Sequence, residues 1–159
     1  IPLAHSETHA LLIGVSGYPS LPESRRLRGP ANDVQLMRAV LLRNGVAPDR
    51  ITVLADSVAK SQSPPSKTAI LDELRVLARR ARSQDWVVVY LSGHGSQQPQ
   101  ADGPQAYREP DGLDEIFLPY DVGRWDGRIG RVTGALVDDE IGAALSAFRR
   151  VTDRHIGAS

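Results

Sequence analysis

Trp86-Val-Val-Val-Tyr-Leu-Ser-Gly-His-Gly95 is the segment from which the architecture of this chain is most readily inferred. Its first part, Val87 to Leu91, contains only β-branched, aromatic and aliphatic residues, and Asp85 precedes it. A short uncharged run of this kind is typical of a strand that is buried on both faces of a parallel sheet. The two glycines that follow allow a sharp turn and leave the imidazole of His94 at the strand end.

The expected position of His94 gives it a chemical role to consider. In open parallel sheets, ligands bind at the rim formed by the carboxyl ends of the strands. A histidine at this rim can accept or donate a proton near neutral pH, which makes His94 a candidate general base or acid. An ordinary histidine in the turn after a strand explains the same local pattern equally well, so the motif alone leaves both interpretations open.

The segments on either side of this strand alternate between strand and helix patterns. The predicted strands are His9–Val15, Ile51–Leu54, Val87–Leu91 and Glu115–Pro119. The predicted helices begin at Asn32, after the N-cap Ser66 and at Asp138. Their expected buried faces comprise Val34, Met37, Val40 and Leu41 in the first; Ile70, Leu74, Leu77, Ala78 and Ala81 in the second; and Ile141, Leu145 and Phe148 in the third. The polar segment Ser96–Gly112 is predicted to be an exposed loop.

This alternation predicts a mostly parallel sheet with right-handed crossovers and helices on both faces, which is a three-layer α/β/α sandwich. At 159 residues the chain is expected to form one domain, residues 1–159, with terminal tails at 1–8 and 151–159. This fold class does not by itself define a function.

Composition and charge exclude several classes of function. The chain has 19 Lys and Arg against 19 Asp and Glu, which argues against nucleic-acid binding and against attraction to anionic membranes. It has no apolar run long enough to span a bilayer and no signal-peptide pattern. Because it contains no cysteine, disulfides, thiolate metal sites and thiol catalysis by its own residues are excluded, and a cytoplasmic location is expected.

Four motifs, taken together, resemble those of caspase-fold cysteine peptidases, most closely bacterial metacaspases. They are His9-Ala-Leu-Leu-Ile-Gly-Val15, Leu27-Arg-Gly-Pro-Ala-Asn-Asp33, Tyr90-Leu-Ser-Gly-His-Gly95, and Asp111-Gly-Leu-Asp-Glu-Ile-Phe-Leu-Pro-Tyr-Asp121 leading to Val137-Asp-Asp-Glu-Ile141. Each motif is weak alone, but their order and spacing over residues 9–148 are specific. The resemblance implies the large-subunit portion of a caspase-like fold, incomplete at its C-terminal side, and an endopeptidase that cuts after Arg or Lys with a His–Cys dyad.

The resemblance also assigns roles to individual residues. It implies that His94 is the partner of the thiol nucleophile, that Gly95 lies near the oxyanion site, and that Ser92 lines the substrate pocket. It places Asp33 in the pocket for the Arg or Lys side chain, whose charge needs a carboxylate partner. Asp33 is equally acceptable as an acidic residue at a helix start, so a capping role is the alternative.

Charged residues elsewhere have two interpretations each. Arg25, Arg26 and Arg28 are expected to be solvated loop charges or a cleavable basic stretch. The resemblance requires no cofactor, but Asp114, Asp138 and Asp139 match positions that bind calcium in calcium-dependent relatives, and hard oxygen ligands suit that ion. The alternative for Asp138 and Asp139 is stabilisation of a helix start, and a further ligand of the family follows the cysteine.

The sequence departs from the family pattern at the nucleophile. The family's cysteine follows the last helix in an Asp-x-Cys-His-type segment, whereas this chain reads Val-Thr-Asp-Arg-His-Ile-Gly-Ala-Ser over residues 151–159. A fragment, a truncated gene product and a pseudoenzyme are the three explanations. We expect this chain alone to be inactive and the missing small-subunit segment to be its partner. Because that segment supplies the neighbouring strand in the caspase fold, Val87–Leu91 is expected to present an unprotected edge.

Two functions from different classes follow. The first is a cysteine endopeptidase that acts on peptides or proteins with Arg or Lys, and the second is a non-catalytic caspase-like domain that binds peptides or partner proteins. A flavodoxin-like ligand-binding domain is a weaker third, because neither G-x-G-x-x-G nor a Walker sequence occurs. A serine nucleophile is disfavoured, since Gly14-Val-Ser-Gly-Tyr18 fails the last position of the G-x-S-x-G elbow.

Overall fold

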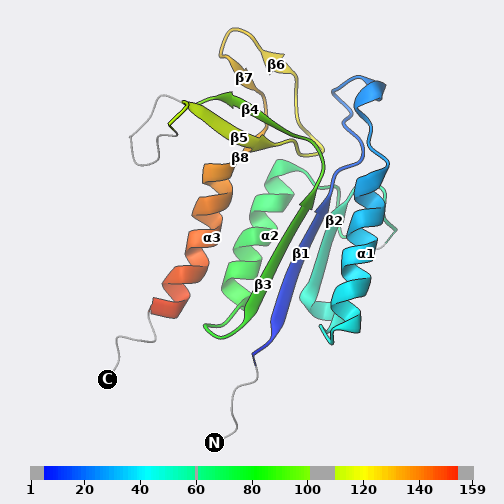
Figure 1. Cartoon of the computed structure of the whole chain (residues 1–159), viewed down its shortest axis with the longest axis vertical. Helices are drawn as coiled ribbons and strands as arrows, with labels where there is room; N and C mark the ends of the chain where they lie inside the picture. Colours follow the sequence, from blue (N-terminus) through cyan, green and yellow to red (C-terminus); the bar gives the residue numbers. More distant parts are fainter. Residues whose placement is uncertain (1–5, 60, 101–109, 154–159) are drawn as a thin grey trace, which may run out of the picture.

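A parallel sheet forms the centre of the molecule. The computed structural model describes residues 6–59, 61–100 and 110–153. Within them, β1 (Thr8–Gly14) lies between β2 (Ile51–Ala55) and β3 (Trp86–Ser92), in the strand order β2-β1-β3 (Figure 1). The register aligns the last residue of β1 with the last residues of both neighbours, so the three strands end at one common rim.

Helices cover both faces of this sheet, which confirms the predicted three-layer α/β/α sandwich. On one face, α1 (Gly29–Arg43) contacts all three strands. On the other face, α2 (Lys67–Arg80) packs on β1 and β2, and α3 (Asp138–Asp153) lies beside α2 (Figure 1). None of the described helices is long and apolar enough to cross a membrane.

The central strand β1 supplies both hydrophobic cores. Because side chains alternate along a strand, Leu11 and Ile13 pack in the core under α2 and α3, whereas Ala10 and Leu12 pack in the core under α1. All four side chains are fully buried. Complete burial of a Leu or Ile side chain stabilises a protein by about 1.5–3 kcal/mol, so β1 holds the three layers together.

β3 occupies a different place from the one that its composition predicts. We expected it to be buried on both faces, and this is wrong: Trp86 is 71% exposed and the residues from Val87 to Ser92 are only half-buried. The reason is its position, since among the described residues β3 pairs with β1 on one side and with no strand on the other. The unprotected edge predicted for Val87–Leu91 is thereby confirmed.

A small antiparallel sheet lies above the carboxyl end of the parallel one (Figure 1). Its strand order is β4-β5-β8, and a separate hairpin joins β6 to β7. The bounds are β4 Gly95–Pro99, β5 Leu113–Phe117, β6 Trp125–Asp126, β7 Arg131–Val132 and β8 Leu136–Val137. The prediction of a loop from Ser96 is therefore wrong for its first residues. Pairing with β5 forms this strand despite its polar sequence, and residues 101–109 lie outside the described residues.

Other predictions differ in detail. α1 begins at Gly29 instead of Asn32, with Pro30 in its first turn, where a missing N–H has no cost. Val40 and Leu145, predicted to face inward, are 45% and 37% exposed. The predicted cap of α2 is confirmed, because the Ser66 hydroxyl accepts a hydrogen bond from the Ala69 N–H. β1 begins at position 8 and α3 continues to position 153, so both elements extend into the predicted tails 1–8 and 151–159.

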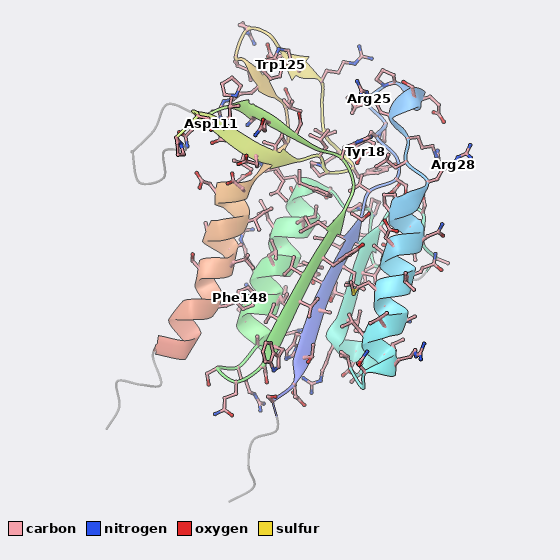
Figure 2. All side chains as sticks on the ribbon, viewed as in Figure 1. Tyr18, Arg25, Arg28, Asp111, Trp125 and Phe148 are labelled. Atoms are coloured by element: carbon pink, nitrogen blue, oxygen red, sulfur yellow. The ribbon has the colours of Figure 1, made fainter. Side chains whose placement is uncertain are left out.

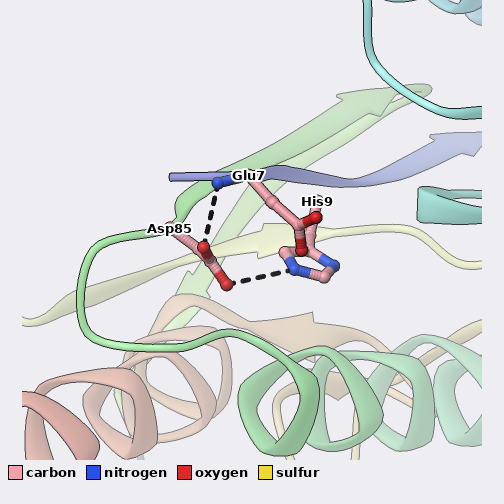
Figure 3. A group of neighbouring side chains, drawn as sticks. All are labelled: Glu7, His9 and Asp85. Atoms are coloured by element: carbon pink, nitrogen blue, oxygen red, sulfur yellow. Dashed lines mark hydrogen bonds and ion pairs between the residues drawn. The ribbon is translucent and has the colours of Figure 1, made fainter. Parts of the chain in front are cut away.

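An ion network ties the amino ends of β1 and β3 together, at the end of the sheet opposite His94 (Figure 3). The buried Asp85 carboxylate accepts hydrogen bonds from the Glu7 and Arg82 N–H groups at 2.9 and 2.8 Å, and its Oδ2 lies 3.3 Å from Nε2 of His9. Arg50 forms an ion pair with Glu7 and approaches His9 Nε2 to 3.4 Å. Because the Arg50 guanidinium lies against both Glu7 and His9, we interpret this network as one that stabilises the fold.

Candidate active site

His94 lies where the two sheets join. β3 ends at Ser92 and β4 begins at Gly95, so Gly93 and His94 are the whole connection. A Cβ atom at Gly93 would lie 2.9 Å from Cζ of Phe117 and 3.1 Å from the Tyr18 hydroxyl oxygen. Only glycine fits this turn without displacing those rings.

Tyr18 holds the main chain of His94 in place. The His94 N–H donates to the Tyr18 hydroxyl at 2.8 Å, and the two ring centroids are 5.1 Å apart. Burial raises the pKa of Tyr18, the His94 N–H partly offsets this, and the Asp56 carboxylate raises it further. The hydroxyl therefore keeps its proton and lies 3.4 Å from the Val15 carbonyl oxygen, to which it can donate. Figure 2 shows Tyr18 at the carboxyl end of the parallel sheet, below Arg25.

A main-chain carbonyl fixes the tautomer of the His94 ring. Nε2 lies 2.8 Å from the carbonyl oxygen of Arg25, in the one-turn helix Glu23–Arg25. A carbonyl oxygen only accepts hydrogen bonds, so Nε2 must carry a proton and donate it. In neutral imidazole the other nitrogen is then unprotonated, which leaves Nδ1 of His94 as the basic atom.

The structure brings the two predicted pocket residues together. The Ser92 hydroxyl, at the end of β3, donates to Oδ2 of Asp33, on α1, at 2.7 Å. Close packing of α1 on β1 permits this, because a Cβ atom at Gly14 would lie 2.7 Å from Cγ2 of Val34. Asp33 does not cap the helix, since the N-cap position is Arg28 and no side chain caps it. The capping alternative for Asp33 is therefore not supported.

Gly95 lies beside His94 at the same rim. It is exposed, opens β4 opposite Phe117, and has space for approach, since the nearest atom to an added Cβ is 3.6 Å away. Ser16, in the segment that fails the elbow pattern, is only 3% exposed, which further disfavours it as a nucleophile.

Comparison with known proteins identifies the family of this chain. Residues 8–152 match the family model described as "Metacaspase, peptidase C14 domain". The chain belongs to the metacaspase family. Metacaspases are caspase-like cysteine peptidases, and this chain contains no cysteine.

Named metacaspases match most of this chain, but the match covers only a small part of their own length. Metacaspase-1 of Candida albicans is 35% identical over 131 residues, covering 82% of this chain and 27% of that protein. Metacaspase-1 of Emericella nidulans is 36% identical over 133 residues, covering 83% and 29%. The chain thus spans less than a third of these relatives. Both are fungal, so the expected likeness to bacterial members is not what these matches show.

A solved structure shares the fold. A crystal structure of a protein from Geobacter sulfurreducens superposes with a TM-score of 0.61 and covers 89% of this chain and 46% of its own. At 24% sequence identity this likeness concerns the fold alone.

The three predicted calcium ligands of this metacaspase chain form a loose acidic cluster. Asp114 is buried on β5, while Asp138 and Asp139 open α3. Burial raises the pKa of Asp138, and the nearby charges of Asp139, Glu115 and Asp114 raise it further against one N–H hydrogen bond. The carboxylates are chemically suited to calcium. Among the described residues, only Glu7, His9 and Asp85 bring three possible ligand atoms within 4.8 Å of one another. The carboxylate oxygens of Asp114, Asp138 and Asp139 do not converge this closely.

Two parts of the site were missed from the sequence. The Arg25 contact uses a main-chain carbonyl, which every residue has, so no side-chain pattern could reveal it. Tyr18 stood only in a motif considered for a serine nucleophile. Its position just after β1 was the available signal, because residues at the carboxyl ends of neighbouring parallel strands meet at one rim.

Proposed function

We propose that this chain is the histidine-bearing portion of a cysteine endopeptidase that cleaves proteins or peptides after Arg or Lys. One observation carries the proposal: the end of β3 presents His94 with its Nε2 at the Arg25 carbonyl and, two residues earlier, Ser92 bonded to Asp33. His94, the proposed proton acceptor, is only two positions from Ser92, which bonds Asp33. The Asp33 carboxylate is suited to bind a cationic side chain.

In this proposal His94 acts first as general base and then as general acid in acyl transfer. Nδ1 accepts the proton of an approaching thiol, and the resulting imidazolium protonates the leaving amine. The Arg25 carbonyl keeps the ring oriented and favours the imidazolium through its hydrogen bond with Nε2–H. The N–H of Gly95 is the candidate donor to the developing oxyanion.

Asp33 would select the substrate. Its Oδ2 already accepts one hydrogen bond from Ser92, and the remaining lone pairs can accept from a guanidinium or ammonium group. A neutral side chain in the same pocket would leave the carboxylate without a cation, so the pocket should discriminate by charge.

The thiol must come from outside these 159 residues, since they include no cysteine. We propose that a cysteine-bearing small-subunit segment adds a strand to the free edge of β3 and is the partner of this chain. β-strand addition uses the unpaired main-chain groups of such an edge. The chain joined to, or co-produced with, its cysteine-bearing segment is called the complemented protein below.

We further propose calcium as an optional ion for Asp114, Asp138 and Asp139, where it would neutralise the acidic cluster and join β5 to the start of α3. A cytoplasmic location also remains a proposal from composition alone.

The decisive experiment compares hydrolysis of an Arg reporter and a matched Gln reporter by the complemented protein. We expect cleavage of the Arg reporter only, and its loss in His94→Ala. Asp33→Asn should lower kcat/KM for Arg by about 30-fold or more, equivalent to roughly 2 kcal/mol or more for a lost charge partner. The control is Asp49→Asn, an exposed acidic residue in the turn before β2.

The outcomes separate the two candidate functions. Binding of Arg peptides that Asp33→Asn weakens, without any turnover, would favour the non-catalytic peptide-binding domain. Equal hydrolysis of Arg and Gln reporters would contradict the role of Asp33.

A further inference from the structure

Three side chains that can ligate a metal ion meet at the amino end of the parallel sheet (Figure 3). Glu7 precedes β1, His9 lies on β1, and Asp85 precedes β3. One ligand atom of each lies within 4.8 Å of the other two. The side chains of His9 and Asp85 are only 8% and 4% exposed. An imidazole nitrogen and two carboxylates form a donor set that suits zinc and similar divalent transition-metal ions.

The spacing of the two buried groups suits a single ion. Nε2 of His9 lies 3.3 Å from Oδ2 of Asp85. Two ligand atoms that are each about 2.0–2.1 Å from a tetrahedral zinc ion are about 3.4 Å apart. An ion can therefore bind both atoms with little movement of either side chain.

Nε2 of His9 faces two partners that make opposite demands on it. The Asp85 carboxylate, at 3.3 Å, only accepts hydrogen bonds, whereas Nη1 of Arg50, at 3.4 Å, only donates them. A ring nitrogen carries either a proton or a free lone pair, so it satisfies one of these partners at a time. A metal ion in place of the Arg50 guanidinium removes this conflict, because it binds the Nε2 lone pair and the carboxylate together.

Arg50 is the group that a metal ion must displace. Its guanidinium forms an ion pair with Glu7 and supplies the positive charge of the cluster. An open cavity of about 290 Å³, lined by Glu7, Arg50 and residues 44–47, lies beside them. This cavity gives an ion a way in and gives the Arg50 side chain room to move aside.

We propose that Glu7, His9 and Asp85 form a zinc site in which the ion replaces the Arg50 guanidinium. The ion binds Nε2 of His9 and one oxygen of each carboxylate, and a water molecule completes the tetrahedral shell. It ties the segment before β1 to the turn before β3 and thereby stabilises the parallel sheet. The site does not depend on the proposed function, because it lies at the end of the sheet opposite His94.

Calorimetric titration of the 159-residue chain with zinc chloride tests the site. The chain has no cysteine, so no thiol competes for the ion. At about pH 7.5, where imidazole is largely neutral, we expect one zinc ion per chain with a micromolar Kd. Saturating zinc should raise the thermal unfolding midpoint by about 4–8 °C. His9→Gln should weaken binding by about 100-fold, whereas His5→Gln and His94→Gln should leave it unchanged.

A pair of arginine variants tests the displacement. Arg50→Gln should tighten zinc binding by about 10-fold, because the guanidinium no longer competes for the carboxylates. The matched control Arg80→Gln removes the same charge from an exposed residue that lines a small cavity together with His9. It should change the Kd by less than about 2-fold, because solvent screens its charge. Equal tightening by both variants, or weaker binding by Arg50→Gln, would overturn the displacement.

A measurement on the unaltered chain keeps the test decisive if a variant fails to fold. The imidazole ¹⁵N resonances are followed by NMR during the same zinc titration. We expect Nε2 of His9 to shift as zinc binds and its Nδ1 to show the protonated form, while the His94 resonances stay in place. Absence of zinc binding, or binding that leaves the His9 resonances unchanged, would overturn the proposed site.

Discussion

At the residue scale, the hydroxyl of Tyr18 supports the main chain of His94, the candidate catalytic residue. In Tyr18→Phe the His94 N–H keeps its place but loses its acceptor. We expect a loss of about 1–2 kcal/mol in the free energy of unfolding and a fall in kcat of the complemented protein with little change in KM. Denaturant unfolding and reporter kinetics measure the two effects. The control Tyr120→Phe should change neither, and an unchanged kcat in Tyr18→Phe would remove Tyr18 from the site.

Asp85 provides a pH-dependent prediction at the same scale. Burial alone would raise its pKa, but the N–H groups of Arg82 and Glu7 and the His9 ring together lower it below the usual 3.8. A carboxyl whose pKa is lower in the folded state stabilises the fold above its unfolded pKa, and this contribution is lost as the pH falls through the folded pKa. Asp85→Asn should therefore cost about 2–3 kcal/mol at neutral pH, and the difference from the parent should shrink below about pH 4.

Urea unfolding of both proteins from pH 7 down to pH 3 measures this difference. Asp49→Asn, an exposed carboxyl, serves as the control and should show a small difference that varies little with pH. A stability difference for Asp85→Asn that stays constant below pH 4 would contradict the assignment.

At the element scale, the contact between α1 and β1 depends on one missing side chain. Gly14→Ala places a Cβ atom 2.7 Å from Cγ2 of Val34 and 2.9 Å from the Pro30 carbonyl oxygen, so α1 must move outward. We expect a destabilisation of about 1–3 kcal/mol by overpacking and a weaker Ser92–Asp33 hydrogen bond. Gly142→Ala, in open space on α3, should stabilise slightly by improving helix propensity. Thermal unfolding compares the two, and a neutral Gly14→Ala would refute the tight packing.

The start of α3 gives a prediction about calcium. Three carboxylates that do not converge offer an incomplete coordination shell, so the 159-residue chain should bind calcium weakly. Calorimetry should show that Asp138→Asn combined with Asp139→Asn abolishes this binding. Tight binding that survives both substitutions would place any calcium site elsewhere.

The elements also show where sequence patterns suffice. β1, β2 and α2 carry apolar residues at regular spacing, and each was predicted within a few residues. β4 was missed because Gly-Ser-Gln-Gln-Pro has no apolar alternation, and only its pairing with β5 makes it a strand. Val40 and Leu145 were misplaced, because helical spacing shows which residues share a face but not how wide the covered part of that face is.

At the scale of the whole molecule, the free edge of β3 should govern how the chain behaves in solution. The Trp86 N–H donates to the Glu7 carbonyl beside β1, and N–H directions alternate along a strand. The amides of Val87, Val89 and Leu91 therefore point away from β1 and have no strand partner among the described residues. We expect the isolated chain to dimerise or aggregate through this edge, and the cysteine-bearing segment to restore solubility and activity together.

Light scattering and amide exchange test this expectation. Strong protection of these three amides in a strictly monomeric chain would mean that the edge is already covered. In that case the proposed place of the partner strand would be wrong.

The candidate site was predictable to the extent that it consists of side chains. The resemblance supplied His94, Ser92 and Asp33, and the structure brings Ser92 against Asp33. The order of the strands could not be obtained from apolar runs alone, which is why β3 was expected to be fully buried. The contacts that orient the histidine come from a carbonyl and a tyrosine far away in the sequence, and only the folded chain brings them together.

The two-residue joint between β3 and β4 has a mechanical consequence. A longer connection would let one sheet tilt against the other while the intervening chain absorbed the motion. Here Gly93 and His94 are the whole link between β3 and β4, so a displacement of β4 relative to β3 acts directly on the main chain of His94. The Tyr18 hydroxyl and the Arg25 carbonyl hold His94 from the side of the parallel sheet, so such a displacement would strain or break these two contacts.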